Sequence, residues 1–405
     1  MNKIFWKITL ILISIYLAVD SLNGLILRYF NFSISIIYKF FILSIMLIII
    51  IKYNIKYFLI ILFIISTFTV IIFLHFLLNI DSLIDFVWSL KYILIIVSYF
   101  FFKVLIKNNK INFIKTFFSV SLIIFIFNIF IGILGFGYSQ YGGGVSIGTR
   151  GLFYGGNEVN LVLIILEIFF LSSSILEKNI KKYFLLSLLF MGIAALLTSK
   201  VALFGTLLII LIFPIINFFI KLKSNFLIDK SSYKFFLLSF FIFFVLSPIF
   251  LYISLFEMNL IIRISYWLGK TNLITLVLSN RNVWLINDYY FLQKNNDLLN
   301  YLVGFGYKKM LSINGKTCEM DLIDEFMLFG IIGVVIIYGF FIIEFLSNMD
   351  KKTFLYPYAP YIEFSIILFI IISIVSGHVM NSGLASILIG AVLSLNYYIN
   401  YISKK

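Results

Sequence analysis

Apolar runs of eighteen or more residues recur along this 405-residue sequence, and each is long enough to cross a bilayer as an α-helix. The runs are continuously apolar and lack the alternation of a barrel strand, so sheets are not expected. Charged residues make up 12% of the chain, whereas a soluble domain has about 25%. The sequence therefore predicts an all-α polytopic membrane protein that forms a single integral membrane domain over residues 1–405.

The apolar runs predict about twelve transmembrane helices. Ten or eleven would remain if the short first run and the tight seventh–eighth junction are counted differently. The expected spans are roughly 5–19, 33–51, 57–79, 84–106, 113–135, 158–176, 183–198, 201–220, 235–255, 326–346, 361–378 and 381–400.

Lysines set the expected orientation in the membrane. They fill every second connection and mark both ends of the sequence, with no arginine among them. The positive-inside rule then places these connections and both termini in the cytoplasm. This pattern explains the net charge of +14 without a nucleic-acid partner.

One long polar interval, residues 256–325, stands out between the apolar runs. It holds seven of the 17 acidic residues and two of the four arginines, Arg263 and Arg281. A connection of this length is uncommon between spans unless it has a function. We expect it to be one large extracytoplasmic loop with short amphipathic helices, and we expect the chemistry there.

All four arginines fall on the expected outer side, while the cytoplasmic positive charge is lysine. A guanidinium group binds phosphate or carboxylate in bidentate fashion, which lysine cannot do. A functional role is therefore predicted for Arg150, Arg263 and Arg281, against the alternative that four residues fall there by chance. Lys200 either snorkels to lipid headgroups or adds a point charge to the same site.

The second outer feature is the glycine-rich loop 136–157, which is not expected to be helical. Its glycines let backbone amides approach a ligand, and Arg150 lies in its middle. Asn157 is expected to cap the following span. Arg150 among free amides at a helix start predicts an anion site, and the alternative is a flexible hairpin.

Residues 279–299 predict an amphipathic helix on the outer leaflet, with Ser279 or Asn280 as its cap and Trp284 at headgroup level. The apolar stripe consists of Trp284, Leu285, Tyr289, Leu292, Leu298 and Leu299.

Four acids lie just ahead of the tenth span, at Glu319, Asp321, Asp324 and Glu325. Part of this is ordinary helix chemistry, because acids are favoured at a helix N-terminus. They could also accept a proton from a sugar hydroxyl or bind a divalent cation. The close spacing and the lack of neighbouring ligands favour the metal-free interpretation, without any cofactor.

Two histidines and one cysteine make a zinc site and an internal disulfide improbable. His378 closes the eleventh span among small residues that open space around it. Its ordinary pKa suits a general base, and the alternative is a packing role. His75 has no such neighbours, so a structural role is expected.

The order of short motifs resembles a known family. RGLFYGGNEVN, LTSKVALFG, SNRNVW, GFGY, EMDLIDEFMLFGIIG and SGH follow one another between about residues 150 and 380, as in bacterial polysaccharide polymerases of the Wzy type within the O-antigen polymerase and ligase superfamily. Lys200 departs from this pattern, because an arginine is frequent there. The acidic EMDLID run stands where ligases tend to have histidine, which favours the polymerases.

This resemblance implies a metal-independent glycosyltransferase with a GT-C-like bundle. It would transfer a growing glycan from undecaprenyl pyrophosphate to the non-reducing end of a lipid-linked repeat unit, on the extracytoplasmic side. A chain-length regulator is an expected partner, together with membrane lipids. By position, the expected catalytic residues are Arg150, Arg281, Glu319, Asp321 and His378, and those expected to bind substrate are Arg263, Lys200, Asn157, Asp324 and Trp284.

Two alternatives stay open at this point. One is a ligase-type glycosyltransferase of the same superfamily, and the other is a lipid-linked oligosaccharide flippase. A flippase should have charged residues within its spans and two similar halves. The in-span charges here are few, namely Lys39, Lys91 and Glu167, and no internal repeat is visible.

Overall fold

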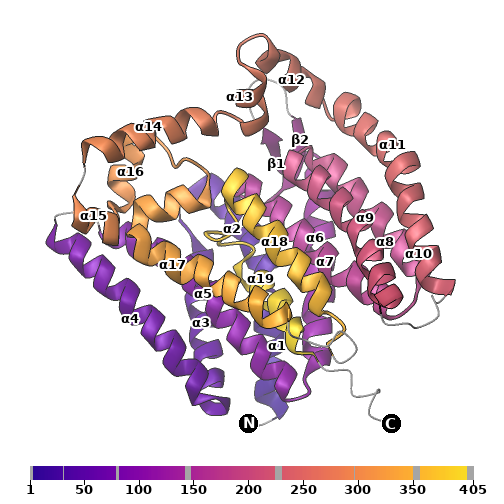
Figure 1. Cartoon of the computed structure of the whole chain (residues 1–405), viewed down its shortest axis with the longest axis horizontal. Coiled ribbons are helices and arrows are strands. Elements are labelled where there is room, and N and C mark those ends of the chain that lie inside the picture. Colours follow the sequence, from indigo (N-terminus) through magenta and orange to yellow (C-terminus); the bar gives the residue numbers. More distant parts are fainter. Residues whose placement is uncertain are drawn as a thin grey trace.

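The structure is a computed structural model of the whole chain, and it describes residues 3–30, 32–78, 82–141, 147–223, 230–295, 297–349 and 356–398. It is a bundle of helices with one small two-stranded sheet (Figure 1). The elements are α1 (Lys3–Ser14), α2 (Tyr16–Phe30), α3 (Ile34–Tyr53), α4 (Ile55–Leu77), α5 (Ser82–Lys107), α6 (Ile111–Ile133), β1 (Tyr138–Tyr141), β2 (Ile147–Gly151), α7 (Gly156–Leu176), α8 (Ile180–Leu197), α9 (Lys200–Lys223), α10 (Lys230–Phe241), η1 (Ile242–Leu246), α11 (Ser247–Tyr252), η2 (Ile253–Glu257), α12 (Leu260–Leu268), α13 (Leu273–Leu278), α14 (Arg281–Lys294), α15 (Leu298–Val303), α16 (Gly306–Asn314), α17 (Asp321–Met349), α18 (Ala359–Val375), α19 (Ser386–Ser394) and η3 (Leu395–Tyr397).

The predicted all-α polytopic fold is confirmed. Among the described residues, nine helices are long and apolar enough to cross a bilayer, and the pair α1–α2, bent by 42°, gives a tenth. The last two of the twelve expected spans correspond to the shorter apolar helices α18 and α19. The expected last span, 381–400, is wrong in extent, because residues 376–385 are not helical and α19 begins only at Ser386.

Two helices form the centre of the bundle. In the apolar 18-residue stretch of α7, 94% of the residues are buried inside the protein, and in the corresponding stretch of α5 the value is 89%. The corresponding share in α4 is 17%, so most of its apolar side chains face outward, as a lipid-facing helix requires. Ser98 of α5 also donates a hydrogen bond to the Ser386 carbonyl, which places α19 against this core.

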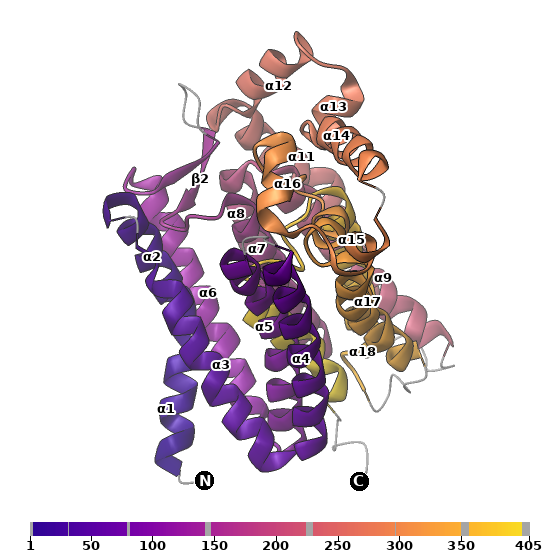
Figure 2. The ribbon, with the colours of Figure 1, turned by 90° about the vertical axis from the view of Figure 1, so that its left-hand side faces the viewer.

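The bundle has two distinct ends. The β-hairpin and α12, α13 and α14 lie at one end, while α1 and the turn between α3 and α4 lie at the other (Figures 1 and 2). We call the first the loop end. At the opposite end, Lys107 bonds the Tyr57 hydroxyl and Lys110 stands over the Trp6 ring. Lys103 stands over Tyr397 near the end of the described chain.

The five short helices α12–α16 occupy the polar interval of the sequence and run across the loop end (Figure 1). A buried pair anchors them to the bundle. His75 of α4 bonds Asp85 of α5 through Nδ1 at 2.7 Å and contacts the Val303 carbonyl through Nε2 at 2.9 Å. Asp85 in turn accepts the Tyr307 backbone N–H at 2.8 Å. His75 therefore has a structural role.

Helix α17 is broken near its start. Gly330 has φ +65° inside the helix, and a Cβ there would lie 2.3 Å from the Leu302 carbonyl oxygen. Gly304, with φ +87°, lies equally close to the Leu328 backbone. Only glycine permits this approach between α15 and α17. The break separates the short acidic segment, which starts at Asp321, from the long apolar remainder of α17.

The glycine-rich loop forms an antiparallel hairpin of β1 and β2, a strand pair that the apolar pattern did not predict. Residues 142–146 lie outside the described part. Helix α14 forms as expected, but the Asn280 side chain makes no capping hydrogen bond. The expected apolar stripe does not form one lipid-facing surface, because Trp284 and Leu285 are only partly exposed, whereas Tyr289 and Leu298 are 57% and 75% exposed. The buried positions of α14 are Arg281 and Asp288.

Candidate functional site

The ten residues between α18 and α19, 376–385, form a non-helical crossing at the centre of the candidate site. Irregular backbone within a membrane protein is tolerated where it is buried in protein or lines a cavity, because its polar groups need partners. In this crossing, two acids from other helices supply those partners. We call this segment the α18–α19 crossing.

Asp321, at the start of α17, holds the first half of the crossing. Its carboxylate accepts the backbone N–H groups of His378 at 2.6 Å, Val379 at 2.7 Å and Met380 at 2.9 Å. The residue is completely buried. Gly377 packs so closely that a Cβ there would lie 2.5 Å from the Glu319 carbonyl oxygen.

Glu158, in the first turn of α7, holds the second half of the crossing. Its Oε2 atom accepts the Leu384 backbone N–H at 2.9 Å. The crossing is thus fixed at both ends by carboxylates that come from α17 and α7. Asn157 precedes Glu158 but is not the expected cap, because α7 begins at Gly156 and Gly155 occupies the N-cap position.

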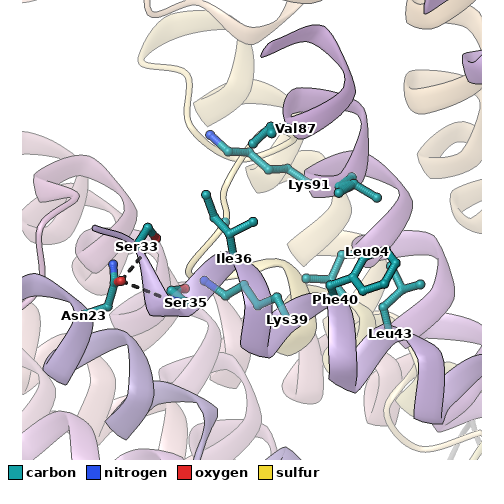
Figure 3. A pocket seen from close by; sticks show the side chains of 12 residues that line it. Asn23, Ser33, Ser35, Ile36, Lys39, Phe40, Leu43, Val87, Lys91 and Leu94 are labelled. Atoms are coloured by element: carbon teal, nitrogen blue, oxygen red, sulfur yellow. Dashed lines mark hydrogen bonds between the residues drawn. The ribbon is translucent and has the colours of Figure 1, made fainter. Parts of the chain in front are cut away.

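A cavity of about 180 Å³ opens beside the crossing, between α2, α3 and α5. Figure 3 shows Lys39 of α3 and Lys91 of α5 extending into it from neighbouring helices. Gly383 of the crossing lies between them, since a Cβ there would be 3.8 Å from the Lys39 ammonium and 3.9 Å from Lys91 Cε. We call this space the lysine cavity.

A second cavity of about 140 Å³ adjoins it and shares Lys39 and Gly383 with it. Asp20 and Glu158 line this second space. Lys39 forms an ion pair with Asp20 at 2.7 Å, and the Ser35 hydroxyl donates to the same carboxylate oxygen. The two cavities together therefore contain two cations and two carboxylates at the edge of the crossing.

Arg281 and Glu319 form a second charged group on the other side of the crossing. The guanidinium group donates to the Glu319 carboxylate from Nη2 at 2.8 Å and to the Glu319 carbonyl from Nε at 2.9 Å. Lys316 adds an ion pair to the same carboxylate at 3.2 Å and stands 3.5 Å above the Trp284 ring. Trp284 therefore packs within this group.

Lys200, at the start of α9, contacts the segment that leads to Arg281. Its ammonium donates to the carbonyls of Leu276 at 2.5 Å and Val277 at 3.1 Å. These are last-turn carbonyls of α13, where a cation is favoured by the helix dipole. Lys200 thus ties the bundle to the short helices at the loop end.

Arg150 lies on β2 and stacks on Tyr138, with its Cζ atom 5.1 Å from the ring centroid. Arg28 of α2 stands 5.6 Å from the same ring. A Cβ at Gly156 would lie 2.9 Å from Arg150 Nη1, so the guanidinium group rests against the start of α7. Its buried Nε has no hydrogen-bond partner among the described residues. Burial lowers the pKa of Arg150 from its ordinary value.

The remaining candidates are placed as follows. His378 is partly buried with φ +65°, and its ring lies within electrostatic reach of the Asp321 carboxylate. Asp324 is buried and accepts the Cys318 backbone N–H at 2.8 Å. Arg263 lies in α12, and its side chain is outside the described part.

The structure brings Arg281, Glu319, Asp321 and His378 together around one half of the crossing. Arg150 lies at the start of α7 near Glu158, which holds the other half. The four acids of the EMDLIDEF run do not converge, because Glu319, Asp321 and Asp324 each bond a different segment. Within the described residues, no three His, Cys, Asp or Glu side chains are placed to share a metal ion.

Four polar residues near the crossing were not among the expected site residues, namely Asp20, Lys39, Lys91 and Glu158. A signal for three of them exists in the sequence. Asp20 and the two lysines lie within or beside apolar runs, where an ionisable side chain is costly and marks a functional site by default. In the sequence, Lys39 and Lys91 served only as evidence that the spans hold too few charged residues for a flippase.

The C-terminal part of the chain, residues 263–405, matches the family model described as O-antigen ligase like membrane protein. The matched region begins in α12 and includes Arg281, Glu319, Asp321 and the whole crossing. This match supports the ligase and polymerase superfamily and does not separate the two activities. No curated protein and no solved structure matches the chain.

Proposed function

We propose that this protein is a glycosyltransferase that polymerises lipid-linked glycan repeat units, moving the growing glycan from undecaprenyl pyrophosphate to the non-reducing end of the next unit. One observation carries the proposal. An irregular crossing within an apolar bundle is fixed by two carboxylates and flanked by cations on both sides. A polar site of this kind suits a charged headgroup that arrives in the membrane plane on a lipid.

In this reaction the bond between the anomeric carbon and the pyrophosphate oxygen breaks, and the acceptor hydroxyl forms the new bond. The lipid pyrophosphate leaves with its negative charge, which nearby cations stabilise. Arg150 is the proposed donor-side cation, because its buried Nε lacks a partner among the described residues. Arg263 and Asn157 are proposed as supporting contacts on the donor side.

The acceptor hydroxyl must lose its proton to a base. His378 is the proposed base, because its partly buried ring forms no hydrogen bond to any described residue, while Asp321 is engaged by three backbone groups. Asp321 is then a positioning residue that holds His378. The segment that precedes Asp321 is positioned by Arg281, Glu319 and Asp324. Lys200 and Trp284 support these three residues.

The proposed orientation places the loop end on the extracytoplasmic side of the bacterial inner membrane. Lys103, Lys107 and Lys110 gather at the opposite end of the bundle. By the positive-inside rule that end is cytoplasmic. A chain-length regulator is a proposed partner at the loop end.

Ligation of the finished glycan to a lipid core is the second candidate, favoured by the description of the matching family. Deletion of the gene separates the two activities. Surface glycan displayed on a gel should show a core bearing one repeat unit if the chain is a polymerase, and a bare core if it is a ligase. Complementation with the wild-type gene should restore long chains, and a deletion strain with an unchanged ladder would refute both.

A further inference from the structure

Lys91 carries a charge that the protein itself does not neutralise by direct contact. Its ammonium lies 3.9 Å from the Trp88 ring centroid, and it forms no hydrogen bond or ion pair with any described residue. Lys39, in contrast, is paired with Asp20. An ammonium group in an apolar bundle without a hydrogen-bond acceptor is unfavourable, so the site suits an anion that supplies one.

The lysine cavity opens toward the lipid-facing side of the bundle. Ile36 and Phe40 of α3 line it, and these two side chains are 46% and 53% exposed on the outside of the protein. The wall beyond them is apolar and includes Leu43, Leu90 and Leu94. This shape fits a ligand that enters from the bilayer with its chain on the α3 side and its headgroup at the lysines.

The headgroup also meets a hydrogen-bond acceptor. Asp20 uses Oδ1 for Lys39 and Ser35, whereas its buried Oδ2 has no partner among the described residues. Asp20 lines the adjoining cavity with Glu158. An unpaired carboxylate oxygen in one cavity and an ammonium without an acceptor in the adjoining cavity match a ligand that carries a hydroxyl near a phosphate, which describes a sugar linked to a lipid phosphate.

We infer that the lysine cavity is a second lipid-phosphate site, in which Lys91 binds the phosphate of a polyprenyl-linked sugar, while Asp20 in the adjoining cavity accepts a sugar hydroxyl. The inference rests on the proposed function, because polymerisation requires two lipid pyrophosphates at once. Arg150 then serves one of them and Lys91 the other. Both cations adjoin the second half of the crossing, since Gly383 lies beside the lysines and Arg150 rests against the start of α7, whose Glu158 holds Leu384.

Native mass spectrometry of the purified full chain can count bound lipids without any activity measurement. The probe is geranylgeranyl pyrophosphate, compared with inorganic pyrophosphate, geranylgeraniol and phosphatidylglycerol. Wild-type protein should bind two molecules of the probe. Lys91→Gln should bind one, with the affinity of the second site weakened roughly tenfold to a hundredfold, the effect of losing one charge-assisted contact. Arg150→Gln should lose the other molecule.

Lys107→Gln is the matched control, because Lys107 lies on the same helix but bonds Tyr57 at the opposite end. It should bind two molecules, as the wild type does. Lys91→Gln gives up the contact with the Trp88 ring but no hydrogen bond or ion pair, so only a small drop in thermal stability is expected, and a thermal unfolding scan of the variant separates loss of binding from misfolding. Gly383→Val, which fills the space between the lysines, should reproduce the Lys91→Gln result.

Two probe molecules retained by both Lys91→Gln and Gly383→Val would overturn the inference. Equal Lys91-dependent binding of phosphatidylglycerol would assign the cavity to a structural phospholipid, and equal binding of inorganic pyrophosphate would assign it to a free anion; either result also refutes it. If gene deletion shows that the protein does not polymerise glycan while Lys91-dependent binding of the probe persists, the proposed function fails and the lipid-phosphate site stands.

Discussion

The Asp321 carboxylate lies 2.6 Å from the backbone nitrogen of His378, although 57 residues separate them in the sequence. The start of α17 thereby fixes the turn after α18, and with it the direction in which the His378 ring points. Asp321, which the sequence predicts to be a catalytic residue, holds the backbone of the crossing with its carboxylate. Its influence on the reaction is proposed to act through the histidine.

Asp321→Asn should weaken this attachment, because the amide has one acceptor oxygen where the carboxylate has two. Hydrogen bonds to a charged group contribute about 1.5–3 kcal/mol each, so a loss on the order of 2 kcal/mol in stability is expected, with much reduced glycan polymerisation. Thermal unfolding of the purified protein and a glycan ladder measure the two effects. Asp297→Asn, at an exposed helix cap that asparagine also satisfies, should leave both unchanged. Wild-type stability in Asp321→Asn would contradict the role of Asp321.

Cys318 reports on the Arg281–Glu319 contact. Its thiol is buried between these residues, and burial raises its pKa well above the ordinary range, so it should react slowly with maleimide. Arg281→Gln removes the ion pair and the Nε contact to the Glu319 backbone. Cys318 should then be labelled at least about tenfold faster, because the segment opens more often. Lys316→Gln, which loses an exposed ion pair and the contact with the Trp284 ring but keeps both Arg281 contacts, is the control and should stay slow. Unchanged labelling in Arg281→Gln would show that the pair does not hold the segment.

Asp288 should make the stability of the short helices depend on pH. Burial raises its pKa to about 6, although Asn314 donates to its carboxylate at 2.9 Å. A raised pKa means that the folded state binds the proton more tightly than the unfolded chain. The contribution of this group therefore grows as pH falls from about 7 toward about 4, and it is unfavourable above about 6.

Asp288→Asn keeps an acceptor for Asn314 and removes the charge. At pH 7.5 it should stabilise the protein by an amount on the order of 2 kcal/mol, and the gain should vanish near pH 4. Thermal unfolding scans from pH 4 to pH 8 measure this difference. A variant that is less stable than wild type at pH 7.5 would disprove the proposed burial of an ionised Asp288.

The His75–Asp85 pair should be essential for docking α15 and α16 onto the bundle. His75→Leu leaves the Asp85 carboxylate buried with only the Tyr307 amide as a partner, which costs about 3–5 kcal/mol. The double variant His75→Leu, Asp85→Leu should recover part of this loss, because no unpaired charge remains. Limited proteolysis between residues 295 and 320 measures the docking. Equal protease resistance in wild type and His75→Leu would argue against the anchor.

The helical class and nearly all spans could be predicted, because each follows from a long local run of apolar residues. The extent of the crossing at 376–385 could not be predicted in the same way. Its small residues, such as Ser376 and Gly383, predicted only space around His378, whereas the length of the crossing depends on the carboxylates of Asp321 and Glu158, which come from distant parts of the sequence. A hairpin was the alternative for the glycine-rich loop, but its strand pairing was not predicted, because the two strands are only four and five residues long and lie outside the apolar runs.

Only some of the expected site residues are neighbours in the structure. The candidates Arg281, Glu319 and Asp321 do lie together, although Arg281 begins α14 and stands 38 residues before Glu319, because its guanidinium group bonds Glu319 across the folded interval. Lys39 and Lys91 come from different helices, and only their packing against Gly383 shows that they face one space. An isolated lysine in an apolar run gives no indication of which other charge it will meet.

The most direct test uses purified protein in lipid nanodiscs with a lipid-linked repeat unit as the only substrate. Wild-type protein should produce a ladder of products that each grow by one unit, with release of one lipid pyrophosphate per bond, and Arg150→Gln should produce none. A wild-type protein that forms no ladder, yet transfers a single glycan when a lipid core is supplied, would contradict polymerisation and identify a ligase.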